Sequence, residues 1–255
     1  MSFDVAADSY DRFMGRYSTP LAPELADFAG IGDEGTVLDV GSGPGALTGE
    51  LVRRLGTDAV AAVDPSEPFV AAARARYPGV DVHLASADEL PFPDGGFDAA
   101  LAQLVVHFMP DPVAGLAEMA RVTRLDGIVA ACVWDLAGDR APLSPFWRAA
   151  RELDPGAPGE SGFPGTRAGH LRELFEEAGL ADVEEDELSV TVEHTSFDEW
   201  WEPFTLGVGP AGAYARSLSH KDLGALQERC RAQFPDGAFP LTVVAWAARG
   251  VVGPR

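Results

Sequence analysis

Three closely spaced glycines are the first feature of the sequence that could take part in binding chemistry. Gly41, Gly43 and Gly45 follow a short apolar run and precede a helix-like run. Because glycine has no Cβ atom, such a loop can turn sharply and let a ligand approach the backbone. Asp64 ends the next apolar run, at about the spacing at which an acidic side chain accepts hydrogen bonds from ribose hydroxyls. The pattern therefore predicts a nucleotide-containing ligand at the ends of two neighbouring strands.

Two side chains are candidates for moving a proton. His107 follows the expected fourth strand and Asp135 follows the expected fifth, so both should lie at the edge of the sheet where ligands bind. A free imidazole has a pKa of about 6.5 and can accept a proton near neutral pH. We therefore expect His107 to act as a general base with a nearly unperturbed pKa, and Asp135 to be the second candidate. The sequence contains no convincing ligand set for a metal, so no metal site is predicted.

The first half of the chain alternates short apolar runs with helix-like segments. This alternation predicts a Rossmann-like, doubly wound and mostly parallel sheet with right-handed crossovers. Strands are expected at residues 36–40, 58–64, 80–86, 97–106 and 127–134, and helices at 46–55, 68–77 and 112–123.

The second half departs from the alternation. A helix is expected at residues 167–178 and strands at 183–194 and 239–250, which would complete a seven-stranded sheet whose last strand is antiparallel. Between these strands lies an aromatic-rich insertion, residues 196–234, which suggests a helical cap above the sheet. Most of its aromatic side chains, with Phe146 and Trp147, are expected to form the core of the cap, and two or three at most to line a pocket for a flat or apolar molecule.

Composition and charge narrow the class of partner. The chain has 255 residues, of which 46% are hydrophobic, enough for a folded core. Its formal net charge of −21 repels phosphate backbones, so neither nucleic acid nor an anionic membrane is expected as a partner. Residues 1–14 carry no apolar leader pattern, and the apolar stretch 127–134 is too short to cross a bilayer. We therefore expect a cytoplasmic protein, and the sequence gives no signal for an oligomeric state.

Two other functions remain open at this point. The loop fits a relaxed dinucleotide fingerprint, Gly41-x-Gly43-x-x-Ala46, which is typical of an NAD(P)-dependent reductase. That reading leaves Pro44 unexplained, and the Tyr-x-x-x-Lys pair is absent because Lys221 is the only lysine. A non-catalytic binding module with a cofactor fold is the third possibility.

Longer motifs carry a resemblance to a known family. "VLDVGSGPGALT", "VDPSEPFVAAARAR" and "ADELPFPDGGFDAALAQLVVHFMPDPVAGLAEMARVTRLDGIVA" occur in this order, after "YDRFMGRYS". Between about residues 10 and 135 the chain resembles the class I S-adenosylmethionine-dependent methyltransferases, in the small-molecule branch similar to quinone and secondary-metabolite enzymes. The resemblance implies transfer of a methyl group from S-adenosyl-L-methionine to a small-molecule acceptor. It leaves open whether oxygen, nitrogen or carbon is methylated.

The resemblance also implies roles for particular residues. Asp39 would act near the amino group of the methionine moiety, with Gln103 beside that moiety. The family position that often carries an adenine-binding Asp is Ser86 here, and either this hydroxyl or Asp88 could contact the adenine. The full cofactor-binding set implied by the resemblance is Tyr10, Arg16, Asp39, Gly41, Ser42, Gly43, Asp64, Pro65, Ser86, Ala87 and Gln103.

The resemblance also implies a division of the chain into functional segments. Residues 1–255 are expected to form a single methyltransferase domain. Within it, residues 1–30 would form helices that cover the cofactor, and residues 31–135 the cofactor-binding core. Residues 136–166 and 196–235 would form the cap and the acceptor pocket.

Overall fold

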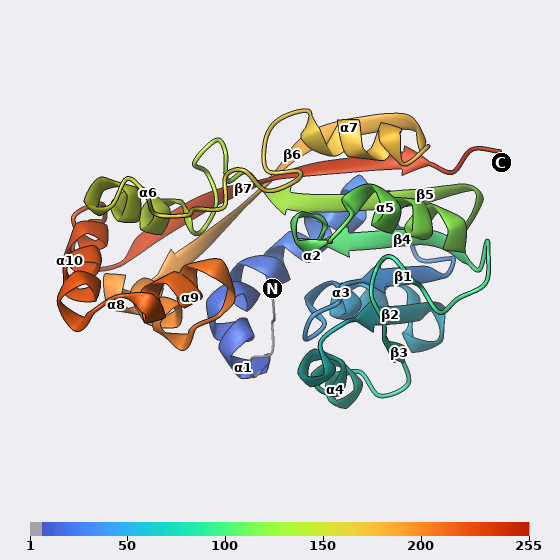
Figure 1. The fold of residues 1–255 in the computed structure, drawn as a ribbon. Helices are drawn as coiled ribbons and strands as arrows, with labels where there is room; N and C mark the ends of the chain where they lie inside the picture. The colour runs from blue at the N-terminus through green and yellow to red at the C-terminus, as the bar shows by residue number, and fades with distance from the viewer. Residues whose placement is uncertain (1–6, 255) are drawn as a thin grey trace.

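A seven-stranded sheet runs through the whole computed structural model, which describes residues 7–254. The strand order is β3-β2-β1-β4-β5-β7-β6, and β7 is antiparallel to both of its neighbours while the other pairs are parallel (Figure 1). This arrangement confirms the predicted seven-stranded fold. The strands are β1 (Val37–Val40), β2 (Val60–Asp64), β3 (Asp81–Leu84), β4 (Phe97–Gln103), β5 (Thr123–Trp134), β6 (Ala181–His194) and β7 (Phe239–Val251).

Helices cover both faces of the sheet and make a three-layer structure (Figure 1). The helices α2 (Arg16–Phe28), α3 (Ala46–Leu55) and α4 (Glu67–Arg76) contribute to one hydrophobic core, and α5 (Pro112–Val122) and α7 (His170–Glu177) to the other. Successive residues of a strand point to opposite faces. Because helices cover both faces, every residue of β1 and β2 is buried, and these strands are apolar in the sequence except for Asp39 and Asp64.

Two strand ends differ most from the sequence-based expectation. The strand β4 stops at Gln103 because the next residue, Leu104, has a left-handed backbone with φ +62°, which turns the chain. The strand β5 starts at Thr123, ahead of the expected residue 127. It is interrupted by a shift in the register with β4, and Asp126 in this stretch has φ +61°. Such a bulge inserts extra residues that no apolar pattern marks.

The cap lies beside the sheet, where the long strands β6 and β7 extend past the ends of the other strands (Figure 1). It consists of α6 (Ser144–Leu153), α8 (Phe197–Trp201), α9 (Gly209–Ser217) and α10 (His220–Arg231). Its aromatic side chains pack mainly against one another: the Phe146 and Phe204 rings are stacked with centroids 4.7 Å apart. Most of them therefore form the core of the cap, as expected.

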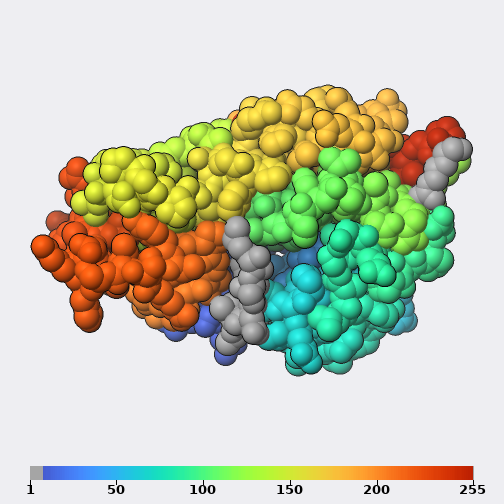
Figure 2. Space-filling model, viewed as in Figure 1, coloured from blue at the N-terminus to red at the C-terminus, as the bar shows by residue number. Residues whose placement is uncertain are grey.

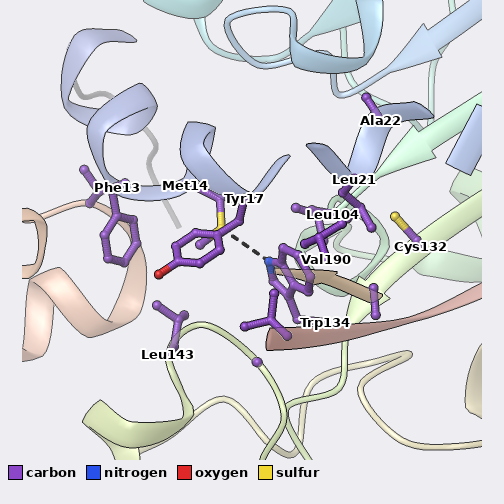
Figure 3. Packing of buried hydrophobic residues seen from close by; sticks show 14 of the residues in the cluster. Phe13, Met14, Tyr17, Leu21, Ala22, Leu104, Cys132, Trp134, Leu143 and Val190 are labelled. Carbon is purple, nitrogen blue, oxygen red and sulfur yellow. Dashed lines mark hydrogen bonds between the residues drawn. The ribbon is translucent and has the colours of Figure 1, made fainter. Parts of the chain in front are cut away.

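The N-terminal segment connects the cap to the sheet. It contains α1 (Ala7–Tyr10), a π-helical turn (Asp11–Gly15) and α2. Residues 1–6, which belong both to the start expected to lack a leader pattern and to the segment expected to cover the cofactor, lie outside the described residues. Figure 3 shows Met14 and Tyr17 against Trp134, whose Nε1 donates a hydrogen bond to the Met14 sulfur at 3.3 Å. Within residues 7–254 we find no helix long and apolar enough to cross a membrane.

Candidate active site

A cavity of about 720 Å³, here called the main cavity, lies at the carboxyl ends of the strands. Its walls come from α1 and from the segments that follow β1, β2, β3 and β4, and the space-filling view is hollowed between the green and the blue to cyan parts of the core (Figure 2). Parallel strands bring these sequence-distant ends to one edge of the sheet. The predicted residues that line it are Tyr10, Gly41, Gly43, Asp64, Pro65, Ser86, Ala87 and Gln103.

The glycine loop has the left-handed backbone that its composition predicts. Gly41, Gly43 and Gly45 have φ values of +72°, +55° and +100°. A Cβ atom on Gly41 would lie 2.5 Å from a methyl carbon of Val105, so this position is closed by packing. At Gly43 the nearest atom would be Tyr10 Cε1 at 3.9 Å. Gly43 is therefore the position at which bare backbone faces the cavity.

Asp64 fastens this loop to the end of β2. Its carboxylate oxygens accept hydrogen bonds from the backbone N–H groups of Gly43 and Ser66, each at 2.8 Å. Burial raises the pKa of Asp64, and the two backbone hydrogen bonds oppose that rise. Carboxylate oxygens have further lone pairs, so Asp64 can hold the loop and still accept from hydroxyl groups of a ligand.

A small recess beside the loop contains buried polar atoms that have no partner. This inner recess, about 20 Å³, shares Tyr10, Gly41 and Gln103 with the main cavity. Asp39 Oδ2 accepts a 2.6 Å hydrogen bond from Thr48, and Gln103 Nε2 donates to the Ser18 carbonyl at 2.9 Å. Among the described residues, no partner meets the remaining buried oxygens, which are Asp39 Oδ1, Gln103 Oε1 and Ser18 Oγ.

Unsatisfied buried acceptors are costly, so a donor-rich group is the natural occupant of the inner recess. The pKa of Asp39 is raised to about 7, mainly by burial and further by the nearby charge of Asp64, against the hydrogen bond from Thr48. Ser42, also predicted, lines this recess. Sequence reasoning missed Ser18, because a serine inside a helix carries no local signal for a site.

Three of the predicted residues line the main cavity from the segments that follow β2 and β3. Pro65, Ser86 and Ala87 are in its wall, whereas Asp88 is exposed and outside it. A hydrogen bond from the Ser86 hydroxyl lowers the pKa of the Asp88 carboxyl. Of the two alternatives for contacting an adenine, Ser86 is therefore the one next to the cavity.

Arg16 does not lie with the other predicted cofactor ligands. Its guanidinium contacts His194 Nδ1 at 3.1 Å and Glu199 Oε1 at 3.3 Å, which links α2 to the cap. Arg16 lines neither the main cavity nor the inner recess. The sequence shows how many residues separate Arg16 from the glycine loop, but it does not show on which side of α2 the Arg16 side chain lies.

Asp135 also lies apart from the cavities. Its two carboxylate oxygens accept hydrogen bonds from Arg140 Nε at 2.5 Å, from the Gly138 backbone N–H at 2.9 Å and from Trp246 Nε1 at 3.0 Å. The carboxylate is buried and fully used within the fold. Asp135 therefore joins the end of β5 to β7 and is not placed to act on a ligand.

His107 lies in a second, smaller cavity of about 40 Å³. Burial lowers the pKa of His107 to about 3, so the imidazole is neutral at physiological pH. The expectation of a nearly unperturbed pKa is therefore wrong, because the sequence does not reveal that the cap and the N-terminal segment exclude water from this side chain. Its Nδ1 has no partner among the described residues.

The second cavity adjoins the main cavity and is mostly apolar. Tyr10, Leu104 and Phe108 line both. The strained Leu104 backbone therefore lies at their boundary, and strain of this kind clusters at functional sites. Besides Tyr10 and His107, one more titratable side chain lines the second cavity, Glu160. Sequence reasoning missed Glu160, which is in a Gly- and Pro-rich loop without periodicity.

The strand order, the glycine loop and the acidic side chains at two strand ends define a Rossmann-like α/β domain with a cavity at the carboxyl ends of its parallel strands. Residues 38–131 match the family model described as a methyltransferase domain. This match, together with the mycobacterial methyltransferase relatives, confirms the resemblance to the class I S-adenosylmethionine-dependent methyltransferases found in the sequence.

Individual relatives match over part of their length. An uncharacterized methyltransferase of Mycobacterium tuberculosis is 38% identical over 140 residues, which are 55% of this chain and 54% of the relative. The chloroplastic 2-methyl-6-phytyl-1,4-hydroquinone methyltransferase 2 of Oryza sativa is 35% identical over 94 residues, 36% of this chain and 27% of that enzyme. The matches to the mycobacterial relatives thus span about half of those proteins.

A solved structure supports the fold over most of the chain. Geranyl diphosphate C-methyltransferase from Streptomyces coelicolor, in complex with Mg²⁺, geranyl diphosphate and S-adenosyl-L-homocysteine, aligns with a TM-score of 0.53. The alignment covers 93% of this chain and 80% of that chain at 16% identity, a level at which the likeness concerns the fold alone.

Proposed function

We propose that this protein binds S-adenosyl-L-methionine and transfers its methyl group to a small, largely apolar acceptor. The observation that carries the proposal is the inner recess, where Asp39 Oδ1 and Gln103 Oε1 are buried acceptors without a partner beside the glycine loop. The ammonium group of a methionine moiety supplies the donors that these oxygens lack. The residues present therefore fit the cofactor.

Each wall of the main cavity has a defined task in this proposal. Asp64 accepts hydrogen bonds from the ribose hydroxyls while it holds the Gly43 backbone in place. Pro65, Ser86 and Ala87 surround the adenine, and Tyr10 closes the cavity from the N-terminal segment. The bound cofactor supplies an electrophilic methyl group on a sulfonium. The protein contributes orientation and exclusion of water, since proximity alone accounts for much of the rate in such reactions.

Charge argues against the reductase alternative. Acidic residues line the main cavity and the inner recess, among them Asp39, Asp64 and Glu67, and no Arg or Lys is found in either wall among the described residues. A dinucleotide would place its anionic pyrophosphate at the glycine loop, where buried carboxylates repel it. A cofactor with a sulfonium and an ammonium group is attracted instead.

The acceptor end of the proposal rests on the second cavity. Its wall includes Phe13, Phe108 and Trp134, so it favours an apolar or aromatic molecule. The hydroquinone methyltransferase of rice and the geranyl diphosphate enzyme of Streptomyces are named for acceptors with large apolar parts. We infer that this chain uses an acceptor of that general kind.

Calorimetry with S-adenosylhomocysteine and NAD tests the proposal, and we expect binding of the first only. Asp64→Ala should weaken S-adenosylhomocysteine binding by about 1.5–3 kcal/mol, the usual range for hydrogen bonds to a charged group. Asp58→Ala, an exposed acid next to the other end of β2, serves as the control and should bind as the wild type does. Equal affinity of a folded Asp64→Ala variant would refute the ribose assignment.

Cofactor affinity should also depend on pH through Asp39. With a pKa of about 7 in the empty site, this carboxyl is mostly protonated at pH 6 and ionised at pH 8. An ammonium group prefers the ionised form, so binding at pH 6 must release a proton, and the Kd should be about tenfold higher at pH 6 than at pH 8. Titrations in buffers of different ionisation enthalpy would detect this proton. Asp39→Asn should lose the dependence, and a wild-type Kd that is the same at both pH values would contradict the assignment.

A further inference from the structure

Glu160 is a buried carboxyl group to which the proposed function assigns no task. It is 2% exposed, although the loop around it is rich in glycine and proline and largely on the surface. Its Oε2 accepts a 2.6 Å hydrogen bond from Trp147 Nε1, a buried donor on α6. The backbone carbonyl of Glu160 accepts from the Phe163 N–H at 3.1 Å. The side chain is therefore held in one place by the cap.

The surroundings of Glu160 are those of a reaction site. It lines the second cavity together with His107 and with apolar and aromatic side chains from four separate parts of the chain. Tyr10, Leu104 and Phe108 line both this cavity and the main cavity, so the two are neighbours. The volume of about 40 Å³ exceeds that of a single water site and suits the reacting end of an acceptor.

We propose that the second cavity receives the hydroxyl group of a phenol-type acceptor and that Glu160 takes the proton from that hydroxyl during methyl transfer. This inference rests on the proposed function. The aromatic side chains of the cavity wall favour an aromatic ring. A carboxylate is the acceptor that an O–H group needs in an otherwise apolar cavity, because a buried hydroxyl without a partner is costly.

The step balances without any further reactant. The phenolic oxygen forms a bond to the methyl carbon, and the bond from that carbon to sulfur breaks with its electron pair remaining on sulfur. The phenolic proton goes to the Glu160 carboxylate and from there to solvent. The products are the methyl ether, S-adenosylhomocysteine and one proton.

The state of Glu160 suits this task better than that of the other candidates. Burial raises the pKa of Glu160 to about 7, and the hydrogen bond from Trp147 opposes that rise. A base with a pKa near the working pH is the most effective. His107 has a pKa near 3 and is a much weaker base, and Asp135 is engaged elsewhere. Titratable side chains on the surrounding elements are those of Tyr10, His107, Arg151 and Tyr214.

The first test needs no acceptor. Because Asp39 also has a pKa of about 7, the infrared difference spectra are taken across pH 5 to 9 on protein that carries Asp39→Asn. In this background a carboxyl group should titrate near pH 7, be lost when Glu160→Gln is added and persist when Glu228→Gln is added. Glutamine keeps the size of the side chain and an oxygen for Trp147, whereas Glu228 is an exposed carboxyl on α10. Trp147→Phe removes the hydrogen bond that lowers the pKa, so the titration should move to higher pH. With Asp39→Asn present, a titration near pH 7 that survives the addition of Glu160→Gln overturns the proposal.

The second test uses 2-naphthol and 2-naphthylamine as probes with the full chain and S-adenosylmethionine. We expect methylation of 2-naphthol, with a rate that rises as pH increases through about 7 because Glu160 must be ionised. Glu160→Gln should lower kcat at pH 8 by about 10²–10⁴-fold and lose this pH dependence, since that is the usual contribution of a general base. Glu228→Gln should behave as the wild type.

Binding of S-adenosylhomocysteine separates the two proposals. If the wild type does not bind it, the proposed function itself fails. If wild type and Glu160→Gln bind it equally but methylate 2-naphthol at the same rate and with the same pH profile, only the role of Glu160 is overturned. A wild type that binds it and methylates 2-naphthylamine alone, or neither probe, overturns the assignment of the hydroxyl acceptor.

Discussion

Gly43→Val is expected to abolish cofactor binding, with a loss of at least about 100-fold in affinity for S-adenosylhomocysteine, or about 2.7 kcal/mol. The backbone at Gly43 faces the main cavity with φ +55°, and the nearest atom to an added Cβ is Tyr10 Cε1 at 3.9 Å. A valine side chain would therefore occupy space that the cofactor needs without colliding with the fold. Calorimetry on the purified variant measures the loss, and circular dichroism verifies that the variant is folded.

The controls separate blocked binding from backbone strain. A left-handed conformation costs a non-glycine residue about 1–2 kcal/mol wherever it occurs. Gly179 has φ +85° and open space around its Cβ position, so Gly179→Val imposes a similar strain at a residue that lines neither the main cavity, the inner recess nor the second cavity. It should lower the melting temperature and leave affinity unchanged. Retained affinity in a folded Gly43→Val variant would mean that the cofactor lies elsewhere.

Gly41 offers the opposite case in the same loop. Its added Cβ would lie 2.5 Å from Val105 Cγ2, closer than atoms approach in folded proteins. A loss of binding in Gly41→Val would therefore report a distorted loop and carry no information on the cofactor. The two glycines look alike in the sequence and differ only in what packs against them.

Most of the sheet could be predicted because its strands are buried on both faces. An apolar run such as Val60–Val63, between a glycine turn and a helix, is most readily interpreted as a buried strand. The ends of strands are less predictable, since they depend on single backbone dihedrals. Leu104 with φ +62° ends β4 although leucine is a residue that rarely adopts this conformation.

The predictable part of the site is the part built by the sheet. The loop after β1, Asp64 and Gln103 meet because parallel strands end at one edge, and the order of motifs in the sequence is enough to place them. Ser18 reaches the inner recess from α2, which packs on α3 and β6, and Glu160 reaches the second cavity from the loop after α6. The positions of both segments depend on tertiary packing. The pKa of His107 is likewise a result of burial, which no local pattern encodes.

Asp135→Ala should destabilise the protein by about 3 kcal/mol and leave the chemistry of the folded protein unchanged. The substitution leaves Gly138 N–H and Trp246 Nε1 without their acceptor and removes one partner of Arg140. Breaking a buried ion pair costs about 3–5 kcal/mol. The lower end applies here because Arg140 is 38% exposed and keeps Glu187 as a second partner. Urea unfolding measures the change in the free energy of unfolding.

The matched variant is Glu184→Ala, which removes an exposed ion pair to Arg249 between β6 and β7. Exposed pairs contribute about 0–1 kcal/mol, so this variant should unfold almost as the wild type does. Because Asp135 lines neither the main nor the second cavity, both variants should bind S-adenosylhomocysteine with wild-type affinity. A stable Asp135→Ala protein with a strongly reduced methyl-transfer rate would restore Asp135 as a base. Urea unfolding of Asp135→Ala thus tests whether Asp135 serves the fold, and the methyl-transfer rate of Glu160→Gln tests whether Glu160 serves the reaction. The two measurements do not depend on each other.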